Sequence, residues 1–582
     1  MLMAPRRKAV PALALALCLG ASTAWAQFSQ ATFPTPPGQV VTGPVFRSNG
    51  TFVPQVATGA DANAYINSTP PTAAFLAGAP ANVVLTAAPT QYVRVFTEGI
   101  TAPNRAFIAG SSTIRGLTPT QIKDVLALPY LPTSVTIVQI PAGTCILTGT
   151  GAPVNSNFAA QPPSIPVGGP WGNGGTYQSY IVGASRSPNC ADPQFLPAAA
   201  YTNQQGLGAL ALAYAPAAGV GNTGALARAL DRAVPPQMFS SGDRLLNVLD
   251  SLNFGTSPAL QQALAQLTGE VYADTQTAVF NSGRLFLDAL RERQQSAPPA
   301  EAAGPLRPWI TAMGAAGSLG GGNGASSVGF GAGGAAFGLD GWVAPSLLVG
   351  VALGYTRGSY GTKGLSGSGG LDSYSIAPYL RYASGAWYLD ASAGYAFNEA
   401  RVSRSIGFSS GYDSISGTTS GLQRGSGFVS RIETGYRLQE WGGLALTPFL
   451  ALNSLVFAQR GFTEQGLAPA NLNVSGQTTA SLQGVLGLEA GYRVAGSGLG
   501  VTGRLGWGHE FQETTRSMKA SLAAVPGAGF TVTGARVPRD VALLGLGLSL
   551  PLGGGQAFLR YTAELGGSLT LQGGMLGGRW TF

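Results

Sequence analysis

The second half of the chain alternates apolar and polar residues with a period of two, in segment after segment. In residues 347–356 the apolar face consists of Leu347, Val349, Val351, Leu353 and Tyr355. Residues 387–398, 482–493 and 556–562 repeat the pattern, and the apolar face of each segment ends in an aromatic residue. Charged residues and glycines take the opposite face. The pattern is typical of a transmembrane β-strand, which presents its apolar side to lipid and its polar side to a lumen.

The low share of charged residues also indicates a membrane environment. Only 10% of the 582 residues are charged, which is less than half the usual share in a soluble chain. Yet no apolar run beyond residue 26 is long enough for a membrane helix. A Gly-rich disordered chain would share this composition, but it would not alternate. The segments from 306 to 582 predict about twelve antiparallel strands in a closed barrel, and a soluble β-sandwich is the alternative.

The last alternating segment, residues 571–582, ends on an aromatic residue. Leu576, Trp580 and Phe582 fall on one face, and we assign Gln572, Arg579 and Thr581 to the other. We expect this segment to be the closing strand of the barrel.

The first 26 residues have the features of a secretory signal peptide. A basic stretch precedes an apolar one of about twelve residues, too short to span a bilayer. Ala24-Trp25-Ala26 then fits a cleavage site, with the cut between Ala26 and Gln27. We therefore expect export across the inner membrane.

Two cysteines, Cys145 and Cys190, remain after the signal. Exported thiols commonly pair, so a disulfide is one interpretation. Two buried free thiols are the other, and the spacing fits no zinc motif.

Histidine occurs once, as His509. The N-terminal half therefore cannot contain a His-based catalytic triad or a zinc site that needs histidine. Basic residues are scattered, which argues against nucleic acid as a partner. We predict no catalytic residue, cofactor or metal.

Residues 27–240 predict a small α+β domain. Residues 91–97 and 176–182 are typical of strands, and residues 118–121 begin a helix with a Thr cap followed by proline. Residues 134–140 and 144–148 flank Pro141-Ala-Gly143 and are expected to form a hairpin.

Residues 241–305 form a helical linker in this interpretation. Leu260, Leu264, Leu267 and Val271 follow helical spacing, and the polar side offers Gln262, Gln266, Glu270 and Asp274. A helix over 270–293 would be about 35 Å long and could plug a bilayer-high lumen. A periplasmic helix outside the pore is the alternative. Lumen-facing charges that could hold the helix, or merely keep the lumen hydrated, are Arg431, Glu433, Glu489, Arg493, Arg560 and Glu564.

With helix, breaker and barrel in this order, the chain resembles the monomeric autotransporters (type V secretion) of Gram-negative bacteria. The resemblance lies in residues 264–273 (LAQLTGEVYA), 284–293 (RLFLDALRER) and 579–582 (RWTF). It implies a barrel at 306–582 in the outer-membrane lipid and a pore-plugging helix within 241–305. It also implies an exported passenger at 27–240, displayed at the cell surface. The inner-membrane secretion machinery and the barrel-assembly machinery are the implied partners, the latter reading Trp580 and Phe582.

Three functions remain open for the N-terminal domain. The first is an adhesion or interaction passenger that meets a host or surface ligand, and the second is a periplasmic domain attached to a porin-like barrel. The third is a toxin passenger, because Arg94, Ser111–Thr113 and the strand at 177–180 faintly resemble ADP-ribosyltransferases. That family's catalytic glutamate would fall near Gln178 or Tyr180, neither of which is acidic.

Overall fold

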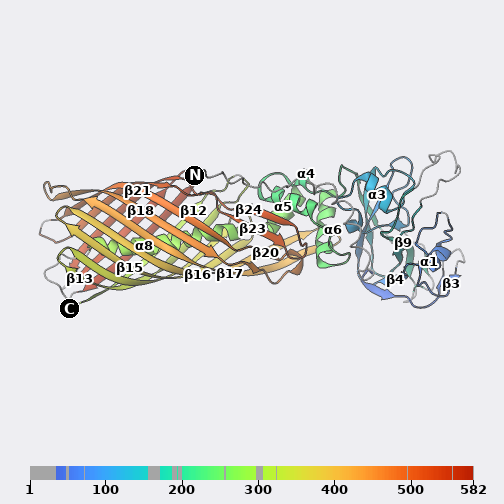
Figure 1. Cartoon of the computed structure of the whole chain (residues 1–582), viewed down its shortest axis with the longest axis horizontal. Coiled ribbons are helices and arrows are strands. Elements are labelled where there is room, and N and C mark those ends of the chain that lie inside the picture. Colours follow the sequence, from blue (N-terminus) through green and yellow to red (C-terminus); the bar gives the residue numbers. More distant parts are fainter. Residues whose placement is uncertain are drawn as a thin grey trace, which may run out of the picture.

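The computed structural model describes residues 35–46, 52–70, 72–154, 171–185, 190, 193–194, 200–254, 257–296, 306–322, 324–494, 496–552 and 555–580. The molecule is elongated, with a strand barrel at one end and a mixed domain at the other (Figure 1). The proposed cleavage residues Ala26 and Gln27 lie outside the described residues, as does Phe582, and the side chain of Trp580 is not described.

Twelve antiparallel strands form the closed barrel, as the alternation predicts. The first strand, β12, pairs with the last, β27, which removes both sheet edges. The strands are β12 (Arg307–Leu319), β13 (Val328–Ala344), β14 (Leu347–Thr362), β15 (Gly367–Ser384), β16 (Trp387–Ser409), β17 (Ser414–Tyr436), β18 (Leu444–Gln459), β21 (Gln477–Arg493), β22 (Gly500–Glu510), β25 (Asp540–Leu552), β26 (Gly555–Leu565) and β27 (Leu569–Trp580).

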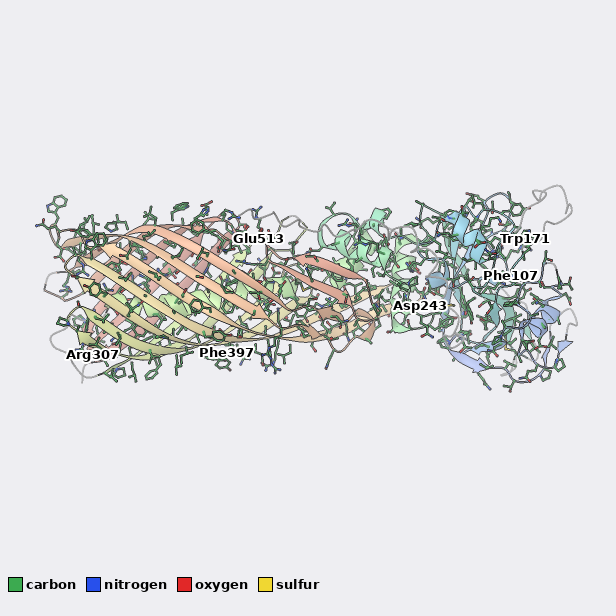
Figure 2. All side chains as sticks on the ribbon, in the orientation of Figure 1. Phe107, Trp171, Asp243, Arg307, Phe397 and Glu513 are labelled. Carbon is green, nitrogen blue, oxygen red and sulfur yellow. A yellow bond between two sulfur atoms is a disulfide. The ribbon has the colours of Figure 1, made fainter. Side chains whose placement is uncertain are left out.

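Aromatic side chains mark the two borders of the lipid-facing wall. At one rim the rings of Trp387 and Tyr436 lie 4.9 Å apart, and ten residues along β16 from Trp387 lies Phe397. With the usual rise and tilt of barrel strands, ten residues span about 25 Å, the height of an outer-membrane apolar band. Figure 2 labels Phe397 on the outside of the wall, with the strands continuing beyond it.

One face assignment in the last strand is wrong. Gln572 lies on the outer face with Leu576, since both are exposed and the Tyr561 hydroxyl donates to Gln572 Oε1 at 3.1 Å. Residues four apart in a strand always share a face.

The connections differ in length between the two rims. At the rim near Trp387 they are short, for example residues 345–346 and 385–386, whereas residues 460–476 and 511–539 at the other rim are long. Long loops of such barrels face the cell exterior and short turns face the periplasm, so the two rims are called the exterior and the periplasmic rim. These loops form a four-stranded sheet and a short helix: β19 (Phe462–Thr463), η2 (Ala468–Ala470), β20 (Leu472–Val474), β23 (Ser517–Leu522) and β24 (Gly529–Thr533).

Helix α8 (Val271–Ser296) runs through the barrel (Figure 1). The pattern over 260–271 predicts one continuous helix, and this is wrong: α7 (Ser257–Leu267) ends before Gly269, whose φ of +70° breaks the helix. A Cβ on Gly269 would also lie 2.4 Å from Leu472 Cδ1. Among the described residues, no helix is long and apolar enough to cross a membrane.

The N-terminal domain contains separate sheets. β7 (Ser134–Ile140) lies between β5 (Thr90–Phe96) and β11 (Ala200–Gly206), whereas β8 (Thr144–Thr150) lies between β4 (Ala81–Thr86) and β9 (Tyr177–Ser185). The predicted hairpin is therefore wrong, because the chain changes sheet at residues 141–143. The remaining elements are β1 (Gly38–Val40), β2 (Val45–Phe46), β3 (Phe52–Val53), α1 (Gly59–Ile66), β6 (Phe107–Ile108), α2 (Ser111–Ile114), α3 (Pro119–Val125) and β10 (Pro193–Gln194).

Helix α6 (Ser241–Phe254) joins this domain to the barrel loops. On one side Asp250 forms a buried ion pair with Arg115 and accepts from the Tyr214 hydroxyl at 2.7 Å. On the other, Arg244 donates to both oxygens of Asp413 in the β16–β17 turn, at 2.7 and 2.8 Å. The helix is therefore held from both directions.

Helices α4 (Ala215–Ala218) and α5 (Gly221–Arg232) pack with the barrel-side core rather than with the N-terminal sheets. Asn222 donates to the carbonyl of Thr533 in β24 at 2.8 Å. The proposed boundary at 240 therefore lies inside a helical unit, and we propose a boundary near residue 212 instead.

Cys145 and Cys190 are joined by a disulfide in the structure, between β8 and the segment after β9. Both are fully buried in the core under α1.

We predict that Cys145→Ser with Cys190→Ser lowers the domain's free energy of unfolding by about 4 kcal/mol, because the bridge closes a loop of 45 residues and so restricts the unfolded chain. Urea unfolding of wild type and double variant would measure it. Peptide mass mapping without reductant that finds free thiols would contradict the bridge.

Candidate functional site

The candidate site is the barrel lumen, which α8 fills. Most side chains of this 26-residue helix are buried, the polar ones included. Wall glycines make room for its large side chains: a Cβ on Gly354 would lie 2.4 Å from Phe286 Cδ2. The helix's own Gly283 packs against Leu455 of β18 in the same way.

The exterior end of the helix is tied to the long loops. The Tyr272 hydroxyl donates to Glu464 Oε1 at 2.7 Å, and Arg404 donates to both oxygens of Glu464 at 2.8 and 2.6 Å. All three side chains are buried. A carboxylate that accepts from a guanidinium fork and a phenol is strongly held.

Two predicted plug residues, Glu270 and Asp274, lie at this same end. Glu270 Oε2 accepts from Asn222 Nδ2 at 2.9 Å, and its other oxygen accepts from the amide of Ser326. Asp274 Oδ1 accepts from the amide of Ala535 at 3.0 Å. Both carboxylates therefore fasten the helix to loops and to α5, not to a strand of the lumen wall.

Near the middle of α8, the side chain of Arg284 contacts the barrel wall. Arg284 Nη2 donates to Ser481 Oγ at 3.1 Å and lies 3.5 Å from a Glu510 oxygen. Its Nη1 lies 3.5 Å from Glu564 Oε1. Glu564, expected on the lumen face, is thus beside the helix.

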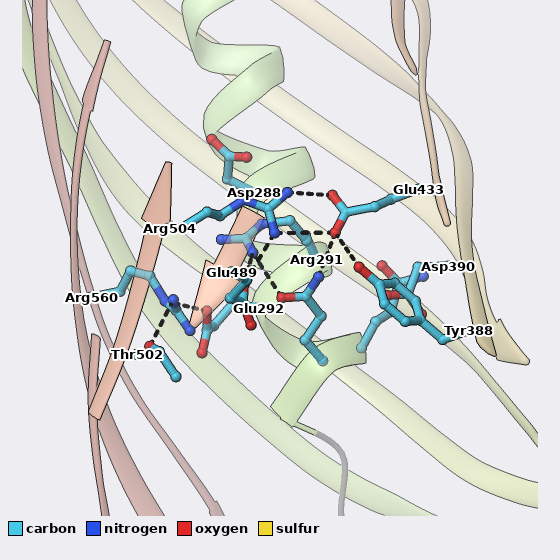
Figure 3. A network of polar contacts seen from close by, with 12 residues as sticks. Asp288, Arg291, Glu292, Tyr388, Asp390, Glu433, Glu489, Thr502, Arg504 and Arg560 are labelled. Carbon is cyan, nitrogen blue, oxygen red and sulfur yellow. Dashed lines mark hydrogen bonds and ion pairs between the residues drawn. The ribbon is translucent and has the colours of Figure 1, made fainter. Parts of the chain in front are cut away.

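The periplasmic end of α8 carries the densest set of ion pairs (Figure 3). Both the helix and the wall carry arginines and acids here, and each charged side chain of the helix named below lies beside a wall side chain of opposite charge. Arg293 donates to both Asp340 oxygens at 2.6 Å. The remaining pairs are Glu292 with Arg560 at 2.5 Å, Asp288 with Arg431 at 3.2 Å and Arg291 with Glu489 at 3.8 Å.

Glu433 is the centre of this end. Its side chain is fully buried and accepts from Arg431 at 2.6 Å, Arg504 at 2.7 Å, the Tyr388 hydroxyl at 3.0 Å and Gln295 Nε2 at 2.6 Å. Gln295 belongs to α8, so the wall carboxylate also holds the helix directly. Two cations beside one buried carboxylate offset part of the cost of burying its charge.

The structure thus brings Arg431, Glu433 and Glu489 together around the helix. Arg493 is different: it is exposed at the end of β21, and no ion pair or hydrogen bond found among the described residues includes its side chain. Sequence reasoning missed Asp340, Arg404 and Glu464. The first two occupy lumen-facing positions, which the alternation of faces along β13 and β16 could have identified. Glu464 lies in a loop, where no such alternation applies.

The lumen shows no arrangement for catalysis. No group of three or more His, Cys, Asp and Glu side chains in the described ranges could hold a metal ion. His509 faces outward, where its Nδ1 lies 2.7 Å from Asp540 Oδ1 and its ring packs between Trp507 and Phe511. The arrangement can hold a helix across a bilayer and close the lumen around it.

A twelve-stranded membrane barrel with a helix fastened through its lumen defines a class of outer-membrane translocators. Residues 308–562 match the family model of the autotransporter β-domain. These residues therefore form an autotransporter β-domain, and this barrel places the chain in the outer membrane.

Several known proteins are similar to parts of this chain. An extracellular serine protease of Serratia marcescens is 28% identical over 310 residues, which are 52% of this chain and 29% of the protease. The chain thus spans less than a third of the length of the curated relatives that it matches. The translocator domain of the autotransporter NalP from Neisseria meningitidis has 18% identity and a TM-score of 0.44, and covers 54% of this chain and 99% of its own. The β-domain of the Bordetella autotransporter BrkA has 21% identity and a TM-score of 0.34, covering 48% and 100% respectively.

Glu433→Gln should loosen the periplasmic end of α8. The substitution leaves Arg291, Arg431 and Arg504 without their shared counter-charge, and breaking a buried ion pair costs about 3–5 kcal/mol. We expect a higher open probability in planar-bilayer conductance. Glu513→Gln is the matched control, since Glu513 is an exposed carboxylate in an exterior loop. Equal conductance in both variants would contradict the role of Glu433.

Proposed function

We propose that this autotransporter carries its own N-terminal domain to the cell surface and keeps it there as an interaction domain. The direction of α8 is the main support. Its N-terminal end lies at the long-loop rim and its C-terminal end at the short-turn rim. A chain that follows this path has its N-terminal domain outside the cell and re-enters the barrel to reach β12.

Docking through α6 supports retention of the domain. Besides the Arg115–Asp250 pair, Gln91 of β5 donates to the carbonyl of Asn247 at 2.8 Å, and Ser251 donates back to Gln91 at 2.8 Å. Burial raises the pKa of Asp243 in the same helix to about 6. Charged and polar groups that are buried between two units favour one fixed arrangement.

The serine protease relatives favour a second candidate, an enzymatic passenger, but the residues here do not support a protease. Residues 27–240 contain no histidine, and Lys123 is their sole lysine. Its Nζ donates to the Trp171 carbonyl at 2.8 Å, so it is placed to support a loop. A Ser-His-Asp triad therefore cannot be assembled from residues 27–240.

The toxin hypothesis has equally little support from the geometry. Arg94 donates to the carbonyls of Ala102 and Phe107 at 3.0 and 2.8 Å and so braces the loop between β5 and β6. Burial lowers its pKa to about 10, which leaves it charged at neutral pH. Ser111 bonds to Asn247 of α6. The hydrogen bonds of Arg94 and Ser111 within the protein therefore explain why these two residues lie where they do.

Protease shaving of intact cells tests the proposal. We expect added protease to remove the N-terminal domain while β12–β27 stay protected by the membrane and by the closed barrel. An immunoblot with antibodies against each half measures it, and a periplasmic protein serves as the control for leakage. Digestion of the domain only after the outer membrane is opened would instead support the porin-like alternative.

A further inference from the structure

The outer wall carries a cluster of arginines within the five consecutive strands β14 to β18. Arg357 lies on β14, Arg401 on β16, Arg424 on β17, and Arg460 directly follows β18. All four are exposed, and the amide of Arg460 donates to the carbonyl of Arg424 at 2.9 Å, which places these two side by side. We call these four residues the outer arginine cluster.

The cluster begins where the exterior aromatic band ends. Tyr355, Tyr374 and Phe397 pair across β14, β15 and β16 and face outward. Arg357 is two residues beyond Tyr355, and Arg424 pairs with Glu399, which is two residues beyond Phe397. Two residues advance a strand by about 6–7 Å. Since aromatic bands sit at the membrane–water interface, the cluster lies at the height of lipid headgroups.

On their outward face the same strands carry no charge between the two aromatic bands. Outward positions of β14 there are Val349, Val351 and Leu353. Outward positions of β16 are Leu389, Ala391 and Ala393. Charge thus starts abruptly at the exterior border.

The local acids do not balance the cluster. Glu399 pairs with Arg424 at 2.9 Å and with Arg401, and Asp372 lies 3.4 Å from Arg401. Four arginines against two carboxylates leave an excess of two positive charges. Within the part of the chain that the structure describes, no ion pair or hydrogen bond includes the side chains of Arg357 or Arg460. These two guanidinium groups flank the paired ones and face outward.

We propose that the outer arginine cluster binds phosphate groups of outer-leaflet lipids. A guanidinium group matches phosphate with two parallel donors, and it is less strongly hydrated than an ammonium group. Exposed cations that directly follow an apolar band meet lipid headgroups in the assembled membrane. Bound lipid would fix the height of the barrel and brace the face from which β16 and β17 extend toward the exterior domain.

The test uses the full-length protein in detergent, titrated with a bis-phosphorylated outer-leaflet glycolipid and with its dephosphorylated form. The variant is Arg357→Gln with Arg460→Gln, because no ion pair or hydrogen bond among the described residues would be lost with either side chain. The matched control is Arg437→Gln with Arg493→Gln, two exposed arginines at the opposite rim. Heat-modifiable electrophoretic mobility verifies that each barrel is folded.

We expect the wild type and the control to prefer the phosphorylated lipid, and the cluster variant to bind it about 30-fold more weakly, which corresponds to about 2 kcal/mol for two cations at an anionic surface. Equal affinity of cluster variant and control would overturn the proposal, as would equal binding of the dephosphorylated lipid. Competition by millimolar inorganic phosphate would assign the site to a free anion and also overturn it.

Discussion

The fold depends on how charge is compensated inside the barrel. Arg284, Arg291 and Arg293 of α8 face wall carboxylates, and the helix acids Asp288 and Glu292 face wall arginines. Each buried charge would be costly alone, and each has a partner within ion-pair distance. An apolar helix could slide in such a lumen, whereas this pattern permits one register. The helix therefore stays in place because displacement would leave several buried charges unpaired.

The two ends of α8 are held by different parts of the chain. At the periplasmic end the strands themselves provide Glu433, Asp340 and Arg560, so the binding site exists once the barrel closes. At the exterior end the partners come from loops, as with Glu464. The loops also carry the sheet against which α5 packs, and α6 connects them to the N-terminal domain. Contacts that hold the helix thus continue into contacts that hold the domain.

The period-two alternation was sufficient to predict twelve strands and, apart from the position of Gln572, their lipid faces, because the barrel wall imposes that period on every strand. It could not predict Gly269 as a helix break, since spacing alone cannot distinguish one helix from two that share a face. Nor could it predict that β7 and β8 join different sheets, because residues 141–143 suit a turn of either kind. Glu464 could not be found at all, as its position in a loop follows no period. Asp340, in contrast, lies at a lumen-facing position that the alternation of faces along its strand identifies.

In the assembled protein α8 occupies the lumen in the register set by its ion pairs. The most direct measurement is cross-linking in cells between Asp288→Cys and Arg431→Cys with a short bifunctional maleimide, since these side chains pair at 3.2 Å. Asn453→Cys with Gln483→Cys, on neighbouring strands, is the control. A cross-link in the outer-membrane form, as efficient as in the control, is the predicted result. A control cross-link without the helix-to-wall cross-link would show that α8 does not occupy the lumen in this register.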